Sequence, residues 1–334
     1  MNIAGISFYL PVAELSNNEL EELYEDWPAA KIYDKIGIKK RHIAAEDETA
    51  GDLAGKAALK LFGEFAIEPQ EIDFILLATQ SPDYFLPTTA CILQHKLGIP
   101  SSAGALDFNL GCSGYVYGLA LAKGLISGSI AQNVLLLTGE TYSKYIHPRD
   151  KSVRTIFGDA GSATLVSRSL KPSIGEFVLG TDGSGFDKLI VPVGGARKLR
   201  AAGPPVETKD ESGNVRSNEN LFMDGAAIFS FTVEKVPEVV RSVLEKNGLA
   251  IGQIDLFVFH HANKFMLDFL RNIIDIPKEK FYVNMADIGN TVSSSIPIAL
   301  RRASDDGILK SGMKVMLVGF GVGLSWGATL VEWK

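Results

Sequence analysis

Short apolar runs alternate with amphipathic segments along most of the chain. The apolar runs are rich in Val, Leu, Ile and Phe and are bounded by turn residues, a pattern typical of buried strands. They comprise residues 72–79, 104–110, 133–140, 254–260 and 314–320. Between them lie segments with the period of an amphipathic helix, such as 49–65 and 230–248, although Pro237 predicts a kink or a later start in the second. Strands that alternate with helices predict an α/β fold.

The order of these elements occurs twice. Residues 68–83 (EPQEIDFILLATQSPD) and 250–265 (AIGQIDLFVFHHANKF) share a polar lead-in, an Ile-Asp pair and an apolar strand that ends in polar residues. In each half, a strand, a glycine and a helix of small residues follow. We interpret this order as an internal duplication with halves of residues 1–170 and 171–334. Residues 196–220 are polar and rich in Gly and Pro, and they predict a long surface loop in the second half.

Composition and charge narrow the class of protein. The net charge is -6 and no long basic run is present, so we expect no nucleic-acid partner. The two cysteines and five histidines show neither a disulfide framework nor zinc-ligand spacing, which favours a reducing cytoplasm and no metal. The N-terminal MNIAGISFYLP has no basic start and no apolar run of signal length. The nearly uncharged Val315–Val331 contains several glycines, so we expect two buried strands around a glycine turn and no membrane span.

One cysteine stands where a reactive thiol would be expected. Cys112 lies in NLGCSGYVYGLALA (109–122), after a predicted strand and at the start of a predicted helix. Free N–H groups and the helix dipole at that position lower the pKa of a thiol. The alternative is a small buried apolar residue, as most lone cysteines are. Cys91 lies inside a predicted helix among apolar neighbours, and there we expect the buried core residue.

Two polar residues of the second half are predicted to lie near Cys112. His260 ends an apolar strand and Asn290 lies in DIGNTVSSS, at the equivalent place in the duplicated order. Ligands of open α/β sheets bind beyond the carboxyl ends of strands, so these side chains can converge. Taken alone, the pattern favours a hydrogen-bonded strut for His260 and a helix cap or turn residue for Asn290. The glycine segment 319–327 is either a simple turn or a source of backbone N–H groups for an oxyanion.

Together these motifs resemble a known family more specifically than any one of them does. They are IGIKKRHIA (36–44), GCSG around Cys112, TIFGDAGSATL (155–165), HHAN (260–263), GNTVSSSIP (289–297) and GFGVGLSWG (319–327). The chain resembles the condensing enzymes of the thiolase superfamily over its whole length, and β-ketoacyl-acyl-carrier-protein synthase III most of all. The resemblance implies a thiolase-like fold, with two duplicated α/β halves stacked as a five-layer αβαβα sandwich, and a homodimer.

The resemblance also implies a mechanism. An acyl group passes from coenzyme A or an acyl carrier protein to Cys112 as a thioester. Malonyl-acyl-carrier-protein then loses carbon dioxide, and its enolate attacks the acyl-cysteine to give the 3-oxoacyl product of fatty acid biosynthesis. His260 and Asn290 donate hydrogen bonds to the malonyl thioester oxygen, and the backbone N–H groups of Cys112 and Val322 hold the oxyanion. No metal or redox cofactor is implied.

Some positions depart from the family pattern. Lys31 and Lys151 stand where the bacterial initiation enzyme stacks adenine between a Trp and an Arg, which predicts weaker use of coenzyme A and a preference for carrier-bound primers. Alternatively, Trp27 serves instead. Leu86 stands where some members place a Phe that limits the primer pocket across the dimer, which predicts a longer acyl chain, although Phe85 is adjacent.

The motif HHAN contributes further candidates. Asn263 is a candidate substrate contact, whereas His261 replaces the family's Gln and is expected to pack or to support its neighbours. Basic residues that follow the motif are either a docking patch for the carrier protein or a solvated helix face. They are Lys264, Arg271, Lys278 and Lys280.

Other functions within the superfamily, and a non-catalytic role, are alternatives to this interpretation. A relative with the same first half-reaction could act in a natural-product, polysaccharide-substituent or unusual-lipid pathway. A non-catalytic partner subunit is disfavoured because Cys112, His260 and Asn290 are all present. Hydroxymethylglutaryl-coenzyme A synthase needs a glutamate where Gln80 stands, and thiolases need a second cysteine in the terminal glycine segment. Chalcone-type synthases share the three residues, but their surrounding motifs fit less well.

Overall fold

Two large β-sheets organise residues 1–24 and 26–334, which the structure, a computed structural model, describes. The first sheet has the order β1-β7-β6-β4-β5 and the second has the order β13-β14-β15-β8. The strands of the first are β1 (Asn2–Tyr9), β4 (Phe74–Ala78), β5 (Gly104–Phe108), β6 (Asn133–Glu140) and β7 (Ala160–Ser167). Those of the second are β8 (Ile174–Thr181), β13 (Leu256–Phe259), β14 (Lys314–Gly321) and β15 (Ser325–Glu332). β4 runs parallel to β5 and β6, and β13 runs parallel to β14, whereas the other pairings are antiparallel.

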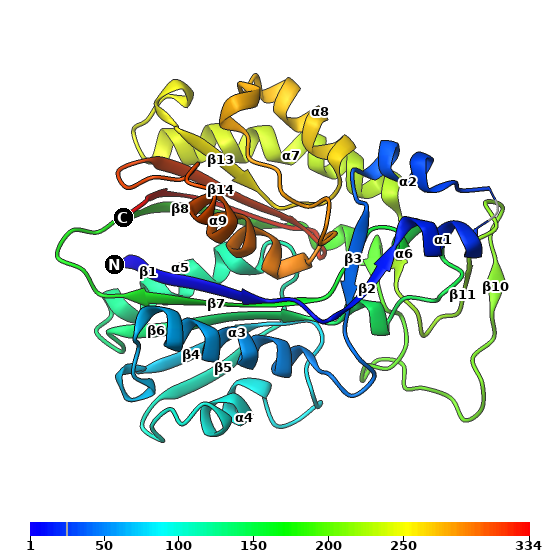
Figure 1. Ribbon diagram of the computed structural model, residues 1–334, viewed down its shortest axis with the longest axis horizontal. Helices are drawn as coiled ribbons and strands as arrows, with labels where there is room; N and C mark the ends of the chain where they lie inside the picture. The colour runs from blue at the N-terminus through cyan, green and yellow to red at the C-terminus, as the bar shows by residue number, and fades with distance from the viewer. Residues whose placement is uncertain (25) are drawn as a thin grey trace.

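Helices form three layers around and between these sheets (Figure 1). The outer face of the first sheet is covered by α3 (Ala50–Phe65) and α4 (Thr89–Lys96). On the second sheet, α7 (Gly225–Lys246) covers the outer face and α8 (Lys264–Ile274) packs against α7. Between the sheets lie α5 (Gly114–Ser127) and α9 (Ser295–Asp305), which contact both. This arrangement confirms the predicted αβαβα sandwich.

Shorter elements gather mainly beyond one end of the sandwich, at the right of Figure 1. They include the strand pairs β2 (Ala13–Ser16) with β3 (Lys40–Ile43), β9 (Leu189–Ile190) with β12 (Phe222–Met223), and β10 (Thr208–Lys209) with β11 (Val215–Arg216). The short α-helices are α1 (Asn17–Leu23), α2 (Ala29–Ile36) and α6 (Lys151–Arg154). The 3-10 turns are η1 (Pro69–Glu71), η2 (Tyr142–Lys144), η3 (Gly183–Gly185), η4 (Ile251–Gln253), η5 (Lys278–Lys280) and η6 (Val292–Ser294).

Local sequence explains how the layers pack. β6 has helices on both faces, so Val134 to Leu137 are all buried and form a continuous apolar run. A capping box between Thr49 and Asp52 starts α3. Gly118 of α5 faces β6 so closely that an added Cβ would lie 2.4 Å from Cδ1 of Leu136. Glycine therefore lets the central helix approach the first sheet.

The two halves of the predicted duplication share one local feature and differ in others. A 3-10 turn precedes each equivalent strand, η1 before β4 and η4 before β13. The counterpart of β5 in the second half is reduced to one bridge between Phe257 and Phe281. The helix predicted at 230–248 begins at Gly225 and continues through Pro237, so the expectation of a later start was wrong.

The long loop and the C-terminal segment both have the structures that the sequence predicts. Residues 196–220 are a largely exposed loop that carries the small β10–β11 hairpin. The nearly uncharged C-terminal segment forms β14 and β15, paired antiparallel and buried as predicted. Among residues 1–24 and 26–334, no helix combines the length and the apolar character that crossing a membrane requires.

Candidate active site

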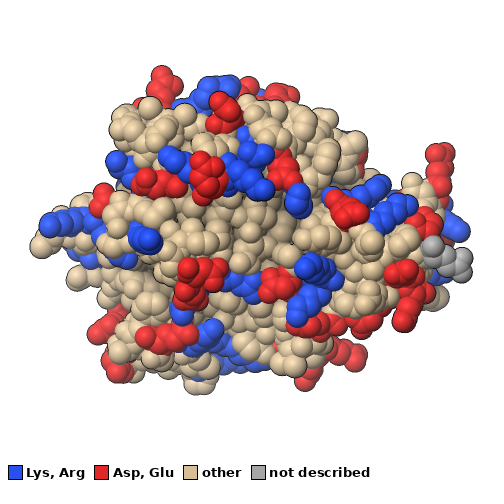
Figure 2. All heavy atoms as spheres, turned by 45° about the horizontal axis from the view of Figure 1, so that its top comes forward, with Lys and Arg blue, Asp and Glu red and all other residues tan. Residues whose placement is uncertain are grey.

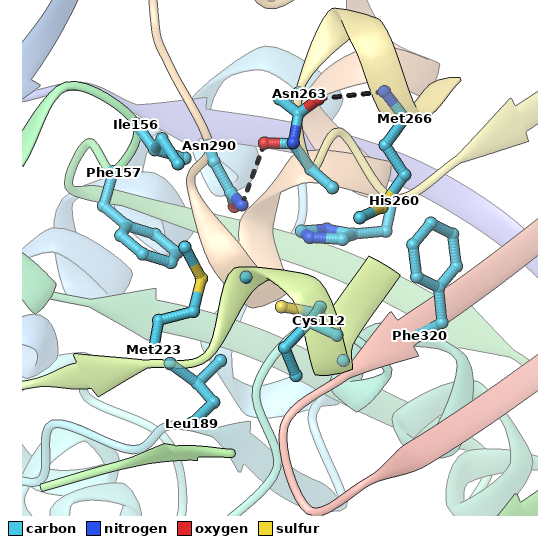
Figure 3. A pocket seen from close by; sticks show the side chains of 14 residues that line it. Cys112, Ile156, Phe157, Leu189, Met223, His260, Asn263, Met266, Asn290 and Phe320 are labelled. Atoms are coloured by element: carbon cyan, nitrogen blue, oxygen red, sulfur yellow. Dashed lines mark hydrogen bonds between the residues drawn. The ribbon is translucent and has the colours of Figure 1, made fainter. Parts of the chain in front are cut away.

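Cys112, His260 and Asn290 line one pocket, as the strand-end argument predicts (Figure 3). Cys112 lies between β5 and α5, His260 directly follows β13, and Asn290 lies just before η6. Each side chain is at least 95% buried. The chain thus brings a thiol, an imidazole and a primary amide from both sheets to one cavity.

Apolar side chains form most of the remaining wall. They are Ile156, Phe157, Leu189, Met223, Ile228, Met266 and Phe320. Leu189 and Met223 come from the paired strands β9 and β12, which flank the long loop. Few convergent polar groups in an apolar cavity are typical of a small-molecule site, and they keep water from a reactive intermediate.

The glycines of β14 allow the strand to pass directly beside Cys112. A Cβ on Gly321 would lie 2.8 Å from Sγ of Cys112, and a Cβ on Gly319 would lie 2.8 Å from the carbonyl oxygen of Cys112. The turn that follows is fixed by Ser325, whose Oγ donates to the carbonyl of Val322 at 2.8 Å and lies 2.7 Å from Oγ of Ser113. This turn presents the backbone N–H of Val322 to the thiol.

The protonation of Cys112 differs from the sequence-based prediction. Burial first, and then the carboxyl of Glu140, raise the pKa of the thiol to about 12. The backbone N–H groups of Val322 and Cys112 itself lower the pKa but do not compensate. The expected fall in pKa at the helix N-terminus was therefore wrong, because desolvation of a thiolate outweighs the nearby dipoles.

His260 is held as a neutral imidazole. Burial, followed by the charge of His261, lowers its pKa to about 3. Nδ1 lies 2.7 Å from Oγ of Ser295, and that hydroxyl also lies 3.0 Å from the carbonyl of Val292. The one hydroxyl proton of Ser295 serves either Nδ1 or the carbonyl. In the first case Nε2 carries the imidazole proton and donates into the pocket, and in the second Nε2 is an acceptor.

The amide of Asn290 has a fixed orientation. Its Oδ1 accepts from the backbone N–H of Val292 at 2.9 Å, and its Nδ2 donates to the carbonyl of Ala262 at 3.3 Å. The second N–H of Nδ2 remains for a ligand. Asn263 lines the same pocket, and its Oδ1 accepts from the N–H of Met266 at 2.9 Å and caps α8 (Figure 3).

Other predicted substrate contacts lie outside this wall. Leu86 is 83% exposed and does not line the pocket within the described chain. Nζ of Lys31 donates to the carbonyl of Asp26 at 3.0 Å, and Nζ of Lys151 donates to the carboxylate of Asp26 at 2.5 Å. Lys31 also lies over the ring of Trp27, 5.5 Å from its centroid. The two lysines therefore meet around Asp26 and Trp27.

The basic residues of the predicted patch divide into two groups. Lys264, Arg271 and Lys278 line one groove between α2 and α8, together with Asp268 and Asp287. Lys280 lies outside this lining, because its Nζ donates to the carbonyls of Gly252 and Ile254 at 3.1 and 2.7 Å. Figure 2 shows Lys and Arg interspersed with Asp and Glu over the face that it presents.

Sequence reasoning missed Glu140 and placed Cys91 wrongly. Glu140 is fully buried beside the site, and its only signal in the sequence is a carboxylate as the last residue of the predicted strand 133–140. Cys91 is exposed near the start of α4, with Sγ 3.0 Å from the carbonyl of Thr88.

The predicted packing role holds for His261, which is buried with Nε2 3.4 Å from the carbonyl of Tyr282. No group of three or more His, Cys, Asp or Glu in the described part of the chain is placed to hold a metal ion.

Comparisons with known proteins point to one family. Two family models match: 3-oxoacyl-[acyl-carrier-protein (ACP)] synthase III over residues 106–183, and its C-terminal model over residues 244–333. Beta-ketoacyl-[acyl-carrier-protein] synthase III of Clostridioides difficile is 37% identical, with 99% of this chain and 98% of that protein covered. The enzyme of the same name from Clostridium tetani is 35% identical, with 100% and 98% covered.

Solved structures agree with these matches. A crystal structure of a 3-oxoacyl-(acyl-carrier-protein) synthase III superposes with a TM-score of 0.98 at 53% identity, and 99% of each chain is covered. The beta-ketoacyl-[acyl carrier protein] synthase III of Thermus thermophilus gives a TM-score of 0.88 at 35% identity, with 100% of this chain and 99% of that chain covered.

Proposed function

Since the chain belongs to the β-ketoacyl-[acyl-carrier-protein] synthase III family, we propose that Cys112, His260 and Asn290 carry out its condensing reaction. The fold is thiolase-like, and the family's members are acyltransferases of fatty acid biosynthesis. The observation that supports these roles is the convergence of the three side chains in one apolar pocket. In this proposal residues 1–170 supply the nucleophile, and residues 171–334 supply the imidazole and the amide.

The first half-reaction is acyl transfer to Cys112. The sulfur bonds to the carbonyl carbon of the primer thioester, and the bond from that carbon to the donor sulfur breaks. The thiol proton passes to Nε2 of the neutral His260 and then to the leaving thiolate, so the protons balance. The N–H groups of Cys112 and Val322 stabilise the tetrahedral oxyanion.

The second half-reaction is decarboxylative condensation. The malonyl thioester of an acyl carrier protein loses carbon dioxide, and the electron pair of the broken bond forms an enolate. With the imidazole in its other tautomer, Nε2–H of His260 and the free N–H of Asn290 donate to the enolate oxygen. The enolate carbon then bonds to the acyl carbon, the carbon–sulfur bond to Cys112 breaks, and the thiolate takes up one proton from solvent. The steps call on no metal or redox group.

Carrier-bound primers are proposed as the preferred donors. Lys31 and Lys151 both bind Asp26, and neither presents a flat surface for adenine. We propose that the groove of Lys264, Arg271 and Lys278 receives an acidic carrier protein, with Asp268 and Asp287 limiting the attraction. Donor preference is measured as kcat/KM for the same primer on coenzyme A and on a carrier protein, and a preference for coenzyme A contradicts the proposal.

A cytoplasmic homodimer is the proposed working form. Tyr84, Phe85 and Leu86 are 62%, 90% and 83% exposed, and the neighbouring β5 is the edge strand of the first sheet. An exposed apolar segment beside an open strand edge suits a second copy of the chain. Leu86 would then border the primer site of the partner, as the family resemblance implies. Two free cysteines suit a reducing compartment.

Separating the two half-reactions tests the roles of the pocket residues. Asn290→Ala removes a donor that acts only on the enolate, so release of carbon dioxide from malonyl carrier protein should fall roughly 100-fold while Cys112 acylation persists. His260→Ala should slow both steps, because His260 also accepts the thiol proton. His261→Gln, at the residue next to His260, serves as the control and should retain both acylation and carbon dioxide release. Condensation at the wild-type rate by Asn290→Ala would contradict the assignment.

A further inference from the structure

Glu140 is a buried carboxyl group that the proposed reaction does not use. It is the last residue of β6 and is fully buried. Among the ion pairs of the described residues, none involves Glu140. A buried carboxyl without a cation is costly unless hydrogen bonds compensate, so its partners indicate what it does.

The partners of Glu140 come from both halves of the chain. The backbone N–H of Gln80 donates to its two oxygens at 3.1 and 3.2 Å, and Oγ of Ser81 donates at 3.2 Å. From the second half, Oγ of Ser293 donates at 3.2 Å. Ser293 belongs to η6, so the carboxyl joins the end of β6 to the segment that carries Asn290.

This segment, residues 290–295, also fixes His260. The N–H of Val292 sets the direction of the Asn290 amide, and Ser295 contacts Nδ1 of His260. Val292 has φ 53°, a left-handed conformation that a β-branched residue adopts only when its surroundings impose it. A strained segment of this kind depends on anchors from outside itself. Ser293 to Glu140 is one anchor, and Ser294 to Thr138, at 2.6 Å, is another.

We propose that Glu140 is a positioning residue, which holds segment 290–295, and with it Asn290 and His260, in place against the half that carries Cys112. The inference rests on the proposed function, because it assigns the condensation step to Asn290 and His260. It predicts that loss of the Ser293 anchor impairs condensation more than it impairs acylation of Cys112.

The charge of Glu140 has a second consequence. The titratable groups that face it are the thiol of Cys112, the carboxyl of Asp159 and the hydroxyls of Tyr142 and Tyr145. None of them is a cation, and burial, more than any neighbour, raises the pKa of Glu140 to about 8. A negative charge on Glu140 and one on Cys112 therefore oppose each other. Removal of the first should ease ionisation of the second.

Two serines of equal bond length provide the matched test. Ser293→Ala removes the anchor to the second half, whereas Ser81→Ala removes a 3.2 Å bond to the same carboxyl within the first half. We expect Ser293→Ala to slow carbon dioxide release from malonyl carrier protein roughly tenfold, the scale of one buried hydrogen bond. Ser81→Ala should change it less than about twofold. Equal effects of the two variants would overturn the positioning role.

A third variant separates charge from anchoring. Glu140→Gln keeps the volume and removes the charge that the carboxyl carries above about pH 8, so in that range the pH profile of Cys112 alkylation by iodoacetamide should move to lower pH. Ser293→Ala should leave that profile in place, because it changes no charge. A variant that only disturbs the local structure should likewise leave the alkylation profile unmoved. An unmoved profile in Glu140→Gln would contradict the charge coupling. A wild-type chain that condenses no thioester would instead overturn the proposed function, and the alkylation profiles would still decide whether the charge of Glu140 acts on Cys112.

Discussion

At the residue scale, the thiol of Cys112 is subject to opposed effects of different size. Its place before α5 and the N–H of Val322 favour a thiolate, but burial and the carboxyl of Glu140 raise the pKa to about 12. The thiol is therefore protonated at rest, and the proposed attack needs an acceptor for its proton at the moment of reaction. The imidazole of His260, whose pKa of about 3 keeps it unprotonated at neutral pH, is the proposed acceptor, and the transfer accompanies the attack because burial disfavours a free thiolate–imidazolium pair.

Alkylation of the resting protein measures this difference directly. The thiolate is the reactive form, so the rate at Cys112 should rise about tenfold per pH unit from about pH 7 to 10, without a plateau. Exposed Cys91 is an internal comparison and should be alkylated before the buried Cys112 at pH 7. Peptide mass spectrometry after timed exposure to iodoacetamide resolves the two sites. A plateau of the Cys112 rate below about pH 8 would show that the dipoles dominate after all.

At the element scale, the start of α7 was predicted less closely than the ends of the strands. The run 133–140 coincides with β6, because Val134 to Leu137 are buried with helices on both faces of the strand and form a continuous apolar stretch. By contrast, α7 starts five residues before the predicted 230, where Oδ1 of Asp224 accepts from the N–H of Ala227. Ala226 is exposed in that first turn, so the apolar periodicity does not extend to the start of the helix. The side-chain cap of Asp224 determines where α7 begins.

The central helix offers a matched pair of glycines. Gly118→Ala in α5 should destabilise the fold by about 1–3 kcal/mol, because its Cβ would overlap Leu136 in a filled core. Gly124→Ala in the same helix meets nothing within 4 Å and should stabilise by about 0.5–1 kcal/mol. Urea unfolding of both variants gives the two free energies. Effects of the same sign would contradict the packing of α5 on β6.

At the scale of the whole molecule, the predicted site followed from topology. Cys112 follows β5 and His260 follows β13, whereas only the bridge of Phe281 precedes Asn290, and the pocket brings the three side chains together. Glu140 ends β6, but in the sequence a carboxylate at the end of a strand indicates a solvent-facing turn residue. Only the packing of η6 over the end of β6 buries it. Lys280 was grouped with Lys264 by sequence proximity, and the backbone carbonyls that bind it lie 26 and 28 residues away.

Stability as a function of pH depends in part on His261. Burial lowers the pKa of His261 to about 4 from its ordinary 6.5. Between these values the unfolded chain binds a proton that the folded chain does not, so stability falls as pH decreases, by about 1.4 kcal/mol per unit. Above 6.5 both states are neutral and the effect vanishes.

The variant His261→Gln removes this contribution and keeps a polar side chain. Between about pH 6.5 and 5, the wild type should lose about 2 kcal/mol more of its free energy of unfolding than the variant. Urea unfolding of both proteins at each pH supplies the comparison, in which other titrating groups cancel. Parallel losses would mean that His261 is protonated in the folded protein.

The central claim is that Cys112 accepts an acyl group. Its most direct test is intact-mass spectrometry of the wild type and of Cys112→Ala after incubation with a panel of acyl-coenzyme A and acyl carrier protein donors. We predict one added acyl group on the wild type, its absence in Cys112→Ala, and the fastest transfer from a carrier-bound donor. No adduct from any donor, or an adduct that persists in Cys112→Ala, would contradict the account.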